Sequence, residues 1–465
     1  MQDDPLMMGT LLREPLSMRG ERLFIEECDT VELARRFGTP LFVISERQLR
    51  NNLRTWQSTF QAHWAHGPVR ILPSLKANPL VAVRKILTEE GAGCDIFGPG
   101  ELECALRGGV TGDLLSVNGS IKSRPLIRRA IEAGARIVLD SPRELEICQQ
   151  EAASLDLAAR VLFRLKPYLA DLDLESDFVP GMQIRDLTQL IKYGIPTREL
   201  LEMAPRALAF PNVDPIGVHV HMGRHSKRLI AWDAWIDACL ALTREVSDLM
   251  SGWTPSFIDL GGGFPSPVDH DPDVAVVNYP TPPLKDFASA VGTACSRALR
   301  RYGFEADGIT LEIEPGRGLH ADTGIHLTTV QNVKADDVHV QQRWAELDTS
   351  EVFLGVHGLN LERPAFDYFI ANRMGAEVSE RYDLVGQTCN AEILMHEVPS
   401  PRLQRRDLLA LLNTGAYAES CASNFNALPR PGTVLANGAN ADLIRRPETI
   451  EDVLARDLLP AHLAG

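Results

Sequence analysis

Short apolar runs alternate with amphipathic stretches along most of the chain. Eight runs rich in Val, Ile and Leu predict strands, at residues 69–72, 92–97, 114–117, 136–139, 160–165, 216–221, 257–260 and 309–313. Between the first two, Leu80, Val83, Ile86 and Leu87 recur at helical spacing before Gly91. Continuous apolar strands that alternate with helices predict a parallel (β/α)8 barrel, with a doubly wound open sheet as the alternative.

Some of the intervening helices have recognisable ends. Asn78-Pro79 supplies an N-cap and a proline at the first helical position, and Ser141 and Glu144 have the spacing of a capping box. A short helix is expected at 126–133. These ends support the division of the chain into strand–helix units.

The two flanks of the barrel differ from it in pattern. Strand-like stretches with turns rich in Pro and Gly occur at 41–44, 325–330, 352–356 and 408–412. We therefore predict a barrel at 46–322 and a β-rich barrel or sandwich domain made of 20–45 together with 323–465. Residues 1–19 are expected to have little regular structure.

Composition narrows the class of protein. The 465 residues are 45% hydrophobic and 23% charged, as in a soluble globular enzyme, and the net charge of −15 disfavours binding to nucleic acid or to an anionic membrane. No run approaches 18 apolar residues, and Asp3 and Asp4 stand where a secretory signal carries basic residues. The eight cysteines form no C-x-x-C pair, which predicts reduced thiols in a cytoplasm.

Residues that follow the predicted strands are the first candidates for chemistry, because a βα barrel places its active site at the carboxyl ends of its strands. They are Lys76, Asp95, Asn118, Asp140, Arg164, His221, Gly261, Gly262, Gly263 and Glu314. A lysine here is either a solvated loop residue or, when desolvated, an amine able to form a Schiff base. The three glycines form either a tight turn or a loop whose N–H groups bind phosphate, to which Gly316 and Arg317 could add.

Two further patterns leave alternatives open. His219 and His221 alternate on one strand face, which is typical of a metal site and would suit a metal-dependent hydrolase. Alternatively, His221 stacks on an aromatic cofactor while His219 belongs to the core. Cys389 and Tyr417 lie in the β-rich part, where a free cysteine is usually a core residue.

Taken together, these motifs resemble a known family. They are Lys76-Ala77-Asn78, Gly93-x-Asp95, Gly100-Glu101-Leu102, Arg164, His221-x-Gly223, Gly261–Gly263, Glu314-Pro315-Gly316-Arg317, Cys389 and Gly415-Ala416-Tyr417. The chain resembles the alanine-racemase-type pyridoxal-phosphate enzymes, and more narrowly the diaminopimelate, ornithine, lysine and arginine decarboxylases, from about residue 20 to residue 455. The segment at 422–426 and the following Pro429-Arg430-Pro431 are closer to the diaminopimelate branch.

The resemblance implies a role for each matched residue. Lys76 holds pyridoxal phosphate covalently, Glu314 keeps its ring nitrogen protonated, and His221 stacks on the ring. The three glycines with Gly316, Arg317 and Tyr417 hold the phosphate, while Asp95 and Arg164 support the surroundings of Lys76. Cys389 reaches in from the partner of a homodimer and returns a proton to the carbon that loses CO2.

Departures from the family pattern bear on the substrate. Asn390 and Ala391 follow Cys389 where the diaminopimelate branch has Glu-Ser, and Asp367 stands where a tyrosine is expected. Such changes weaken a pocket for a distal carboxylate and favour a distal ammonium. Arg224 replaces a serine on the phosphate side, which Ser226 could compensate.

The expected substrate pocket contains Arg363, Asp367, Asn390, Glu392 and Tyr417, and no metal is expected. We predict a cytoplasmic amino-acid decarboxylase that converts a D-configured basic amino acid, of the D-lysine or D-ornithine type, into a diamine. The alternatives are a meso-diaminopimelate decarboxylase, a non-catalytic regulatory relative and a metal-dependent hydrolase.

Overall fold

The computed structural model describes residues 12–170, 172–176, 181–223, 227–267, 280–355, 366–391 and 393–463. The described residues divide into two compact units. One runs from Arg50 to Leu319, and the other contains the chain up to Leu49 and from His320 onward. Each unit is described by itself.

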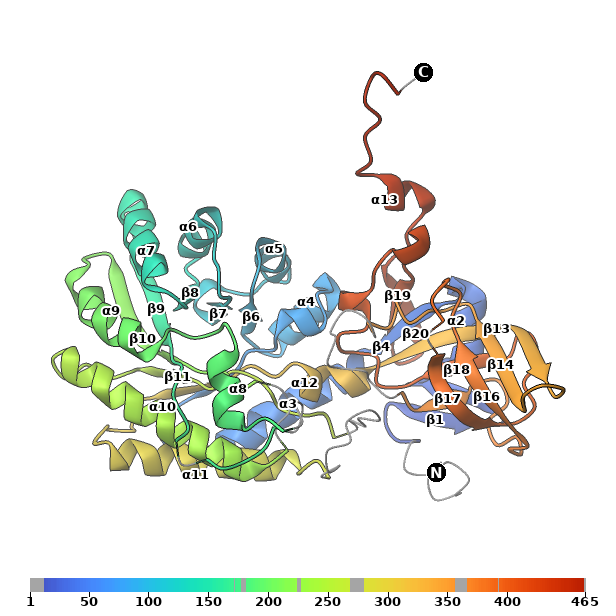
Figure 1. The fold of residues 1–465 in the computed structure, drawn as a ribbon, viewed down its shortest axis with the longest axis horizontal. Coiled ribbons are helices and arrows are strands. Elements are labelled where there is room, and N and C mark those ends of the chain that lie inside the picture. Colours follow the sequence, from blue (N-terminus) through green and yellow to red (C-terminus); the bar gives the residue numbers. More distant parts are fainter. Residues whose placement is uncertain are drawn as a thin grey trace. The chain divides into compact units, whose positions relative to one another are not determined.

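The first unit contains the predicted barrel (Figure 1). Its parallel strands are β5 (Val69–Ile71), β6 (Cys94–Ile96), β7 (Leu115–Val117), β8 (Arg136–Leu139), β9 (Ala159–Arg164), β10 (Val213–His219), β11 (Phe257–Asp259) and β12 (Thr310–Ile313). They pair in the order β5-β12-β11-β10-β9-β8-β7-β6. The Gly93 N–H donates to the Ile71 carbonyl at 3.0 Å, and Ser74 forms an isolated parallel β-bridge with Asp95. The last strand in this order, β6, therefore lies next to the first, β5. The sheet therefore closes on itself, which confirms the (β/α)8 prediction over the open sheet.

Helices follow the strands. They are α3 (Glu46–Ala62), α4 (Val81–Glu89), α5 (Pro99–Arg107), α6 (Arg124–Glu132), α7 (Pro142–Leu155), α8 (Ile184–Leu190), α9 (Thr197–Ala209), α10 (Leu229–Leu249), α11 (Leu284–Arg301) and α12 (Arg317–His320). Within the described residues, no helix has both the length and the apolar character needed to cross a membrane.

One predicted helix start, at Asn78-Pro79, is wrong, and another, at Ser141-Pro142, is correct but lacks the predicted capping box. The chain turns sharply after β5 into a 3-10 helix, Leu75–Ala77, and Asn78 closes this turn by donating its N–H to the Leu75 carbonyl at 3.0 Å. The α4 helix consequently begins only at Val81. Ser141 is the N-cap of α7 but makes no side-chain capping bond. The Glu144 carboxylate instead accepts the backbone N–H groups of Lys122 and Asp140, at 3.0 and 2.8 Å.

The second unit is rich in β-structure. A small sheet contains β1 (Leu16–Arg19), β2 (Arg22–Ile25) and β3 (Cys28–Asp29), and the large sheet contains β4 (Leu41–Ser45), β13 (Gly324–Asp336), β14 (Gln342–Leu347), β15 (Tyr368–Ile370), β16 (Glu380–Val385), β17 (Ile393–Ser400), β18 (Leu408–Leu411), β19 (Gly432–Asn437) and β20 (Asn440–Arg445). Two short helices, α2 (Thr30–Phe37) and α13 (Ile450–Leu454), complete it.

The N-terminal strand β4 lies inside the large sheet. It pairs antiparallel with β13 and parallel with β19, so both ends of the chain build one sheet, as predicted. Leu41 and Val43 pack into one apolar cluster of this unit and Phe42 into the other. Burial on both faces explains why the sequence of β4 is continuously apolar.

Two expectations for this unit differ from the structure. Residues 1–19 were expected to have little regular structure, but Leu16–Arg19 form β1 because they pair with β2. The predicted strand at 352–356 is a turn over its described residues. There the N–H groups of Phe353 and Leu354 donate back to Ser350 and Glu351, at 3.1 and 3.2 Å, and are not available to a neighbouring strand.

Candidate active site

Lys76 lies at the carboxyl end of β5 among hydrogen-bonding groups. Its Nζ donates to Ser74 Oγ at 2.6 Å and to Asp95 Oδ2 at 3.2 Å, and lies 4.5 Å from the centre of the Phe97 ring. Burial alone would raise the pKa of Asp95, but the Lys76 ammonium and the hydrogen bonds to the carboxylate lower it. Asp95 is therefore ionised and holds the lysine amine in place.

Asn118, at the end of β7, joins two carboxyl groups of the barrel. Its Nδ2 donates to Asp95 Oδ1 at 2.6 Å and to Glu314 Oε1 at 2.8 Å. All three side chains are buried. One amide therefore holds the carboxyl groups of Asp95 and Glu314 next to each other.

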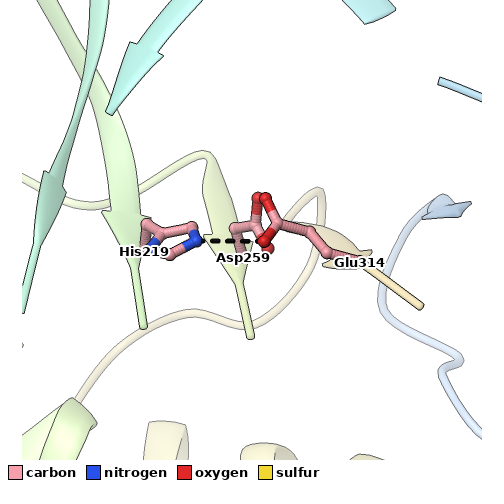
Figure 2. A group of neighbouring side chains, drawn as sticks. All are labelled: His219, Asp259 and Glu314. Carbon is pink, nitrogen blue, oxygen red and sulfur yellow. Dashed lines mark hydrogen bonds and ion pairs between the residues drawn. The ribbon is translucent and has the colours of Figure 1, made fainter. Parts of the chain in front are cut away.

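Glu314, which follows β12, meets His219 and Asp259 in a fully enclosed cluster (Figure 2). Glu314 Oε2 lies 3.3 Å from His219 Nε2. A ring nitrogen of His219 and a carboxyl oxygen from each acid all lie within 4.8 Å of one another. Burial, and after it the charge of Asp95, raises the pKa of Glu314 to about 8. Burial and the neighbouring Glu314 raise the pKa of Asp259 well above its usual value. Burial lowers the pKa of His219 to about 4, so this imidazole is neutral at pH 7.

The two histidines of the predicted pair occupy different surroundings. His219 ends β10 and contacts Glu314, whereas the His221 Nδ1 atom accepts the Gly223 N–H at 3.0 Å. Burial, followed by the charges of Arg164 and Lys76, lowers the pKa of His221 well below its usual value. Among the residues that the structure describes, the group with atoms placed to bind a metal ion contains His219 with Asp259 and Glu314 but not His221, so the two histidines of the His-x-His alternative do not converge.

Gly261 and Gly262 follow β11 at positions where no side chain fits. Gly261 has φ of +65°, and a Cβ there would lie 2.4 Å from the Val220 carbonyl oxygen. A Cβ on Gly262 would lie 2.6 Å from the Glu314 carbonyl oxygen. The backbone of this turn, which we call the bare turn, thus carries no side chains at these two positions, as the close approach of a phosphate to its N–H groups requires.

Phe264, which follows Gly263, connects the glycine turn to an aromatic cluster. Phe264 is buried, stacks on Trp232 with ring centres 4.3 Å apart, and meets Trp56, Phe60 and Phe287 edge to face. These ring contacts hold Phe264, and with it the end of the glycine turn, in a closely packed cluster.

Arg164 ends β9 next to Tyr193. Its guanidinium carbon lies 4.6 Å from the Tyr193 ring centre, its Nε is 3.8 Å from Asp140 Oδ1, and Tyr193 meets Phe97 edge to face. The buried Nη1 atom of Arg164 has no hydrogen-bond partner among the described residues. A buried donor without a partner indicates a ligand or water at this position.

Several residues of this site were not assigned by the sequence. Asn118 was only a strand-end candidate, and Asp259, Phe97 and Tyr193 had no predicted role. Asp259 could have been found, since it is a carboxylate at a strand end two residues before Gly261. Tyr193 follows α8 in a loop that carries no recognisable pattern.

Most of the remaining predicted residues belong to the second unit or lie outside the described residues. Cys389 is exposed, and its Sγ accepts from Asn426 Nδ2 at 3.3 Å. Asp367 is buried, and Tyr417 has φ of +62°. Gly316 and Arg317 belong to the first unit and follow Glu314 after Pro315, whereas Asn390 follows Cys389 in the second unit. Outside the described residues lie Arg224, Ser226, Arg363 and Glu392.

Comparison with known proteins identifies the family. A model for the pyridoxal binding domain of pyridoxal-dependent decarboxylases matches residues 46–321, more than half of the chain. The chain belongs to the pyridoxal-dependent decarboxylase family. As a member of this family, it is a carboxy-lyase that uses pyridoxal phosphate. The bare glycine turn and the unpartnered Arg164 Nη1 fit such a phosphorylated cofactor.

Relatives of this decarboxylase match almost its whole length. It is 29% identical over 448 residues to a diaminopimelate decarboxylase of Methanothermobacter thermautotrophicus, covering 95% of this chain and 96% of the relative. It is 30% identical to one of Archaeoglobus fulgidus, covering 95% and 98%. The crystal structure of diaminopimelate decarboxylase from M. jannaschii superposes with a TM-score of 0.83 at 25% identity, covering 97% and 100%.

A lysine/ornithine decarboxylase of Vibrio vulnificus has the same fold. Its structure with putrescine superposes with a TM-score of 0.69 at 22% identity and covers 88% of this chain and 98% of its own. These comparisons give no support to a metal-dependent hydrolase or to a non-catalytic relative.

Proposed function

We propose that the chain is a meso-diaminopimelate decarboxylase that forms lysine. The observation that carries this proposal is the match to proteins of that name over 448 residues, which extends through the β-rich unit as well as the barrel. This is the alternative of the sequence analysis, and the relatives favour it over the D-lysine and D-ornithine prediction.

We propose that Lys76 is the residue that carries the cofactor. Ser74 and Asp95 hold its Nζ at 2.6 and 3.2 Å, and the Phe97 ring covers one side of it. When bound, pyridoxal phosphate supplies an electron sink for the electrons left by CO2 loss. The bare turn at Gly261–Gly263, with Arg317, would hold the phosphate.

Glu314 is the proposed partner of the cofactor's ring nitrogen. It is fixed by Asn118 at 2.8 Å and by His219 at 3.3 Å, and its pKa of about 8 means that it carries a proton at pH 7 before the cofactor binds. Glu314 would supply this proton to the ring nitrogen of a bound cofactor and would then remain as a carboxylate. His221, neutral at pH 7, is the proposed stacking partner of the ring.

Cys389 is the proposed proton donor to the carbon that loses CO2, acting across a homodimer. Its thiol is exposed in the β-rich unit, as a residue that acts in a second subunit must be. A mixture of Lys76→Ala and Cys389→Ala chains should then recover roughly a quarter of the wild-type activity, because mixed dimers keep one intact site. No recovery would contradict the shared site. Location in the cytoplasm stays a prediction of the sequence.

A second substrate class is favoured by one observation. Asn390 and Ala391 stand where the diaminopimelate branch has Glu-Ser, and the buried Asp367 replaces an expected tyrosine. A pocket with these residues suits a D-configured amino acid with a distal ammonium, such as D-lysine or D-ornithine.

The test is kcat/KM for meso-diaminopimelate, D-lysine, D-ornithine and the L-forms of the two basic amino acids. The proposal expects the highest value for meso-diaminopimelate. A higher value for D-lysine or D-ornithine would establish the second class instead. In that case the double variant Asn390→Glu/Ala391→Ser should shift the preference back towards meso-diaminopimelate.

A further inference from the structure

Asp259 lies between the glycine turn and Glu314. It ends β11 with no exposed surface, and its register partners are His219 on β10 and Glu312 on β12. Its Oδ1 accepts the Gly261 N–H at 2.9 Å. One carboxyl group therefore contacts both the turn proposed to hold the phosphate and the acid proposed to contact the ring nitrogen.

A second acid lies close to Asp259. No N–H or hydroxyl group of the described residues donates to the buried Oδ2, and carboxyl oxygens of Asp259 and Glu314 lie within 4.8 Å of one another. Two carboxyl groups can hydrogen-bond only if one of them is protonated, since two carboxylates have no proton to share. Two buried acids this close together therefore favour a state in which one of them is protonated.

Charge counting leads to the same conclusion. His219, the base that contacts this pair, is neutral at pH 7 because burial lowers its pKa to about 4. The described cations around the barrel interior have other acidic partners: Lys76 with Asp95, Arg164 with Asp140, and Arg136 and Arg70 with Glu312. No cation is thus left to balance two ionised, fully buried carboxylates at Asp259 and Glu314.

We propose that Asp259 is a positioning residue that works as a neutral carboxylic acid: its hydroxyl donates to Glu314, so that Glu314 alone carries the negative charge that pairs with the protonated ring nitrogen. This inference rests on the proposed role of Glu314. A buried acid kept neutral in this way can donate a hydrogen bond at pH 7. Burial and the adjacent Glu314, which raise the pKa of Asp259, keep the proton in place.

Asparagine is the isostere of a neutral aspartic acid, and this gives the test its contrast. In Asp259→Asn, Oδ1 can still accept the Gly261 N–H and Nδ2 can donate to Glu314, so we expect the dissociation constant for pyridoxal phosphate to stay within about threefold of wild type. Asp259→Leu loses both contacts, and Glu314→Gln loses the carboxylate. Each is expected to weaken binding roughly 10- to 100-fold. Asp307→Asn, at a 94% exposed side chain of the same unit, is the matched control.

The holoenzyme provides a direct reading that does not depend on affinity. The infrared spectrum of the wild-type holoenzyme at pH 8 should contain the carbonyl stretch of a protonated carboxylic acid, which is lost in Asp259→Asn and kept in Asp307→Asn. Absence of this band from the wild type would overturn the inference, as would an Asp259→Asn affinity as low as that of Glu314→Gln. If Glu314→Gln binds like wild type, the proposed role of Glu314 fails, whereas a loss in both amide variants leaves that role intact and overturns only the neutral Asp259.

Discussion

Binding of the cofactor is expected to weaken above pH 8 because Glu314 then loses its proton. Below that pH, Glu314 of the free protein holds the proton that the ring nitrogen needs, so binding requires none from solvent. Above it, Glu314 is already ionised, and each binding event takes up one proton. The association constant should therefore be level below pH 8 and fall as the pH rises.

The size of the effect follows from the pKa of about 8 that burial and Asp95 impose on Glu314. Between pH 7 and pH 9 the association constant should fall about tenfold, and by about another factor of ten for each further pH unit. In Glu314→Gln the side chain does not titrate, so binding should be weaker throughout and should lack this slope.

Calorimetric titration with pyridoxine 5′-phosphate measures this effect as the difference in slope between wild type and Glu314→Gln, because the ligand's own titration enters both. The ligand has the ring nitrogen and the phosphate but no aldehyde, so the titration of Lys76 does not enter through a covalent bond. Glu305→Gln removes an exposed carboxylate of the same unit and should keep the wild-type slope. A wild-type association constant that does not change with pH up to 9.5 would refute the reasoning, as would the same pH dependence in Glu314→Gln.

Three further predictions concern the turn, the barrel interior and the thiol. Gly262→Ala places a Cβ 2.6 Å from the Glu314 carbonyl oxygen and should weaken cofactor binding at least about tenfold in an absorbance titration, at a cost of about 1–3 kcal/mol in stability. Arg136→Met leaves Glu312 buried without its main partner and should lower the free energy of unfolding by roughly 3–5 kcal/mol in urea, most of which Arg136→Met/Glu312→Leu should restore. Cys389→Ser should lower kcat roughly 100- to 10,000-fold. In lysine formed in D2O by this variant, deuterium at the carbon that lost CO2 should no longer have a single configuration. Labelling with the same single configuration as in the wild type would exclude this thiol as the donor.

The sequence by itself located the strands of the barrel. All eight predicted runs overlap an observed strand, because strands buried on both faces are continuously apolar and the helices between them are amphipathic. The sequence also placed Lys76, Asp95 and Glu314 at strand ends, where a closed parallel barrel brings them together. It was wrong at 352–356, since an apolar run in a turn looks like a short strand when its local hydrogen bonds are unknown.

Only the tertiary structure decided which ionisable side chains of the barrel meet in its interior. His219 ends β10, Asp259 ends β11 and Glu314 follows β12, and nothing in their spacing along the chain says that they meet. Closure of the sheet makes them neighbours, and burial then changes their chemistry: the same Glu that would be ionised in solution at pH 7 holds a proton here. Residue types and strand ends can be read from sequence, but distances between strand ends and exclusion of water arise only when the barrel closes.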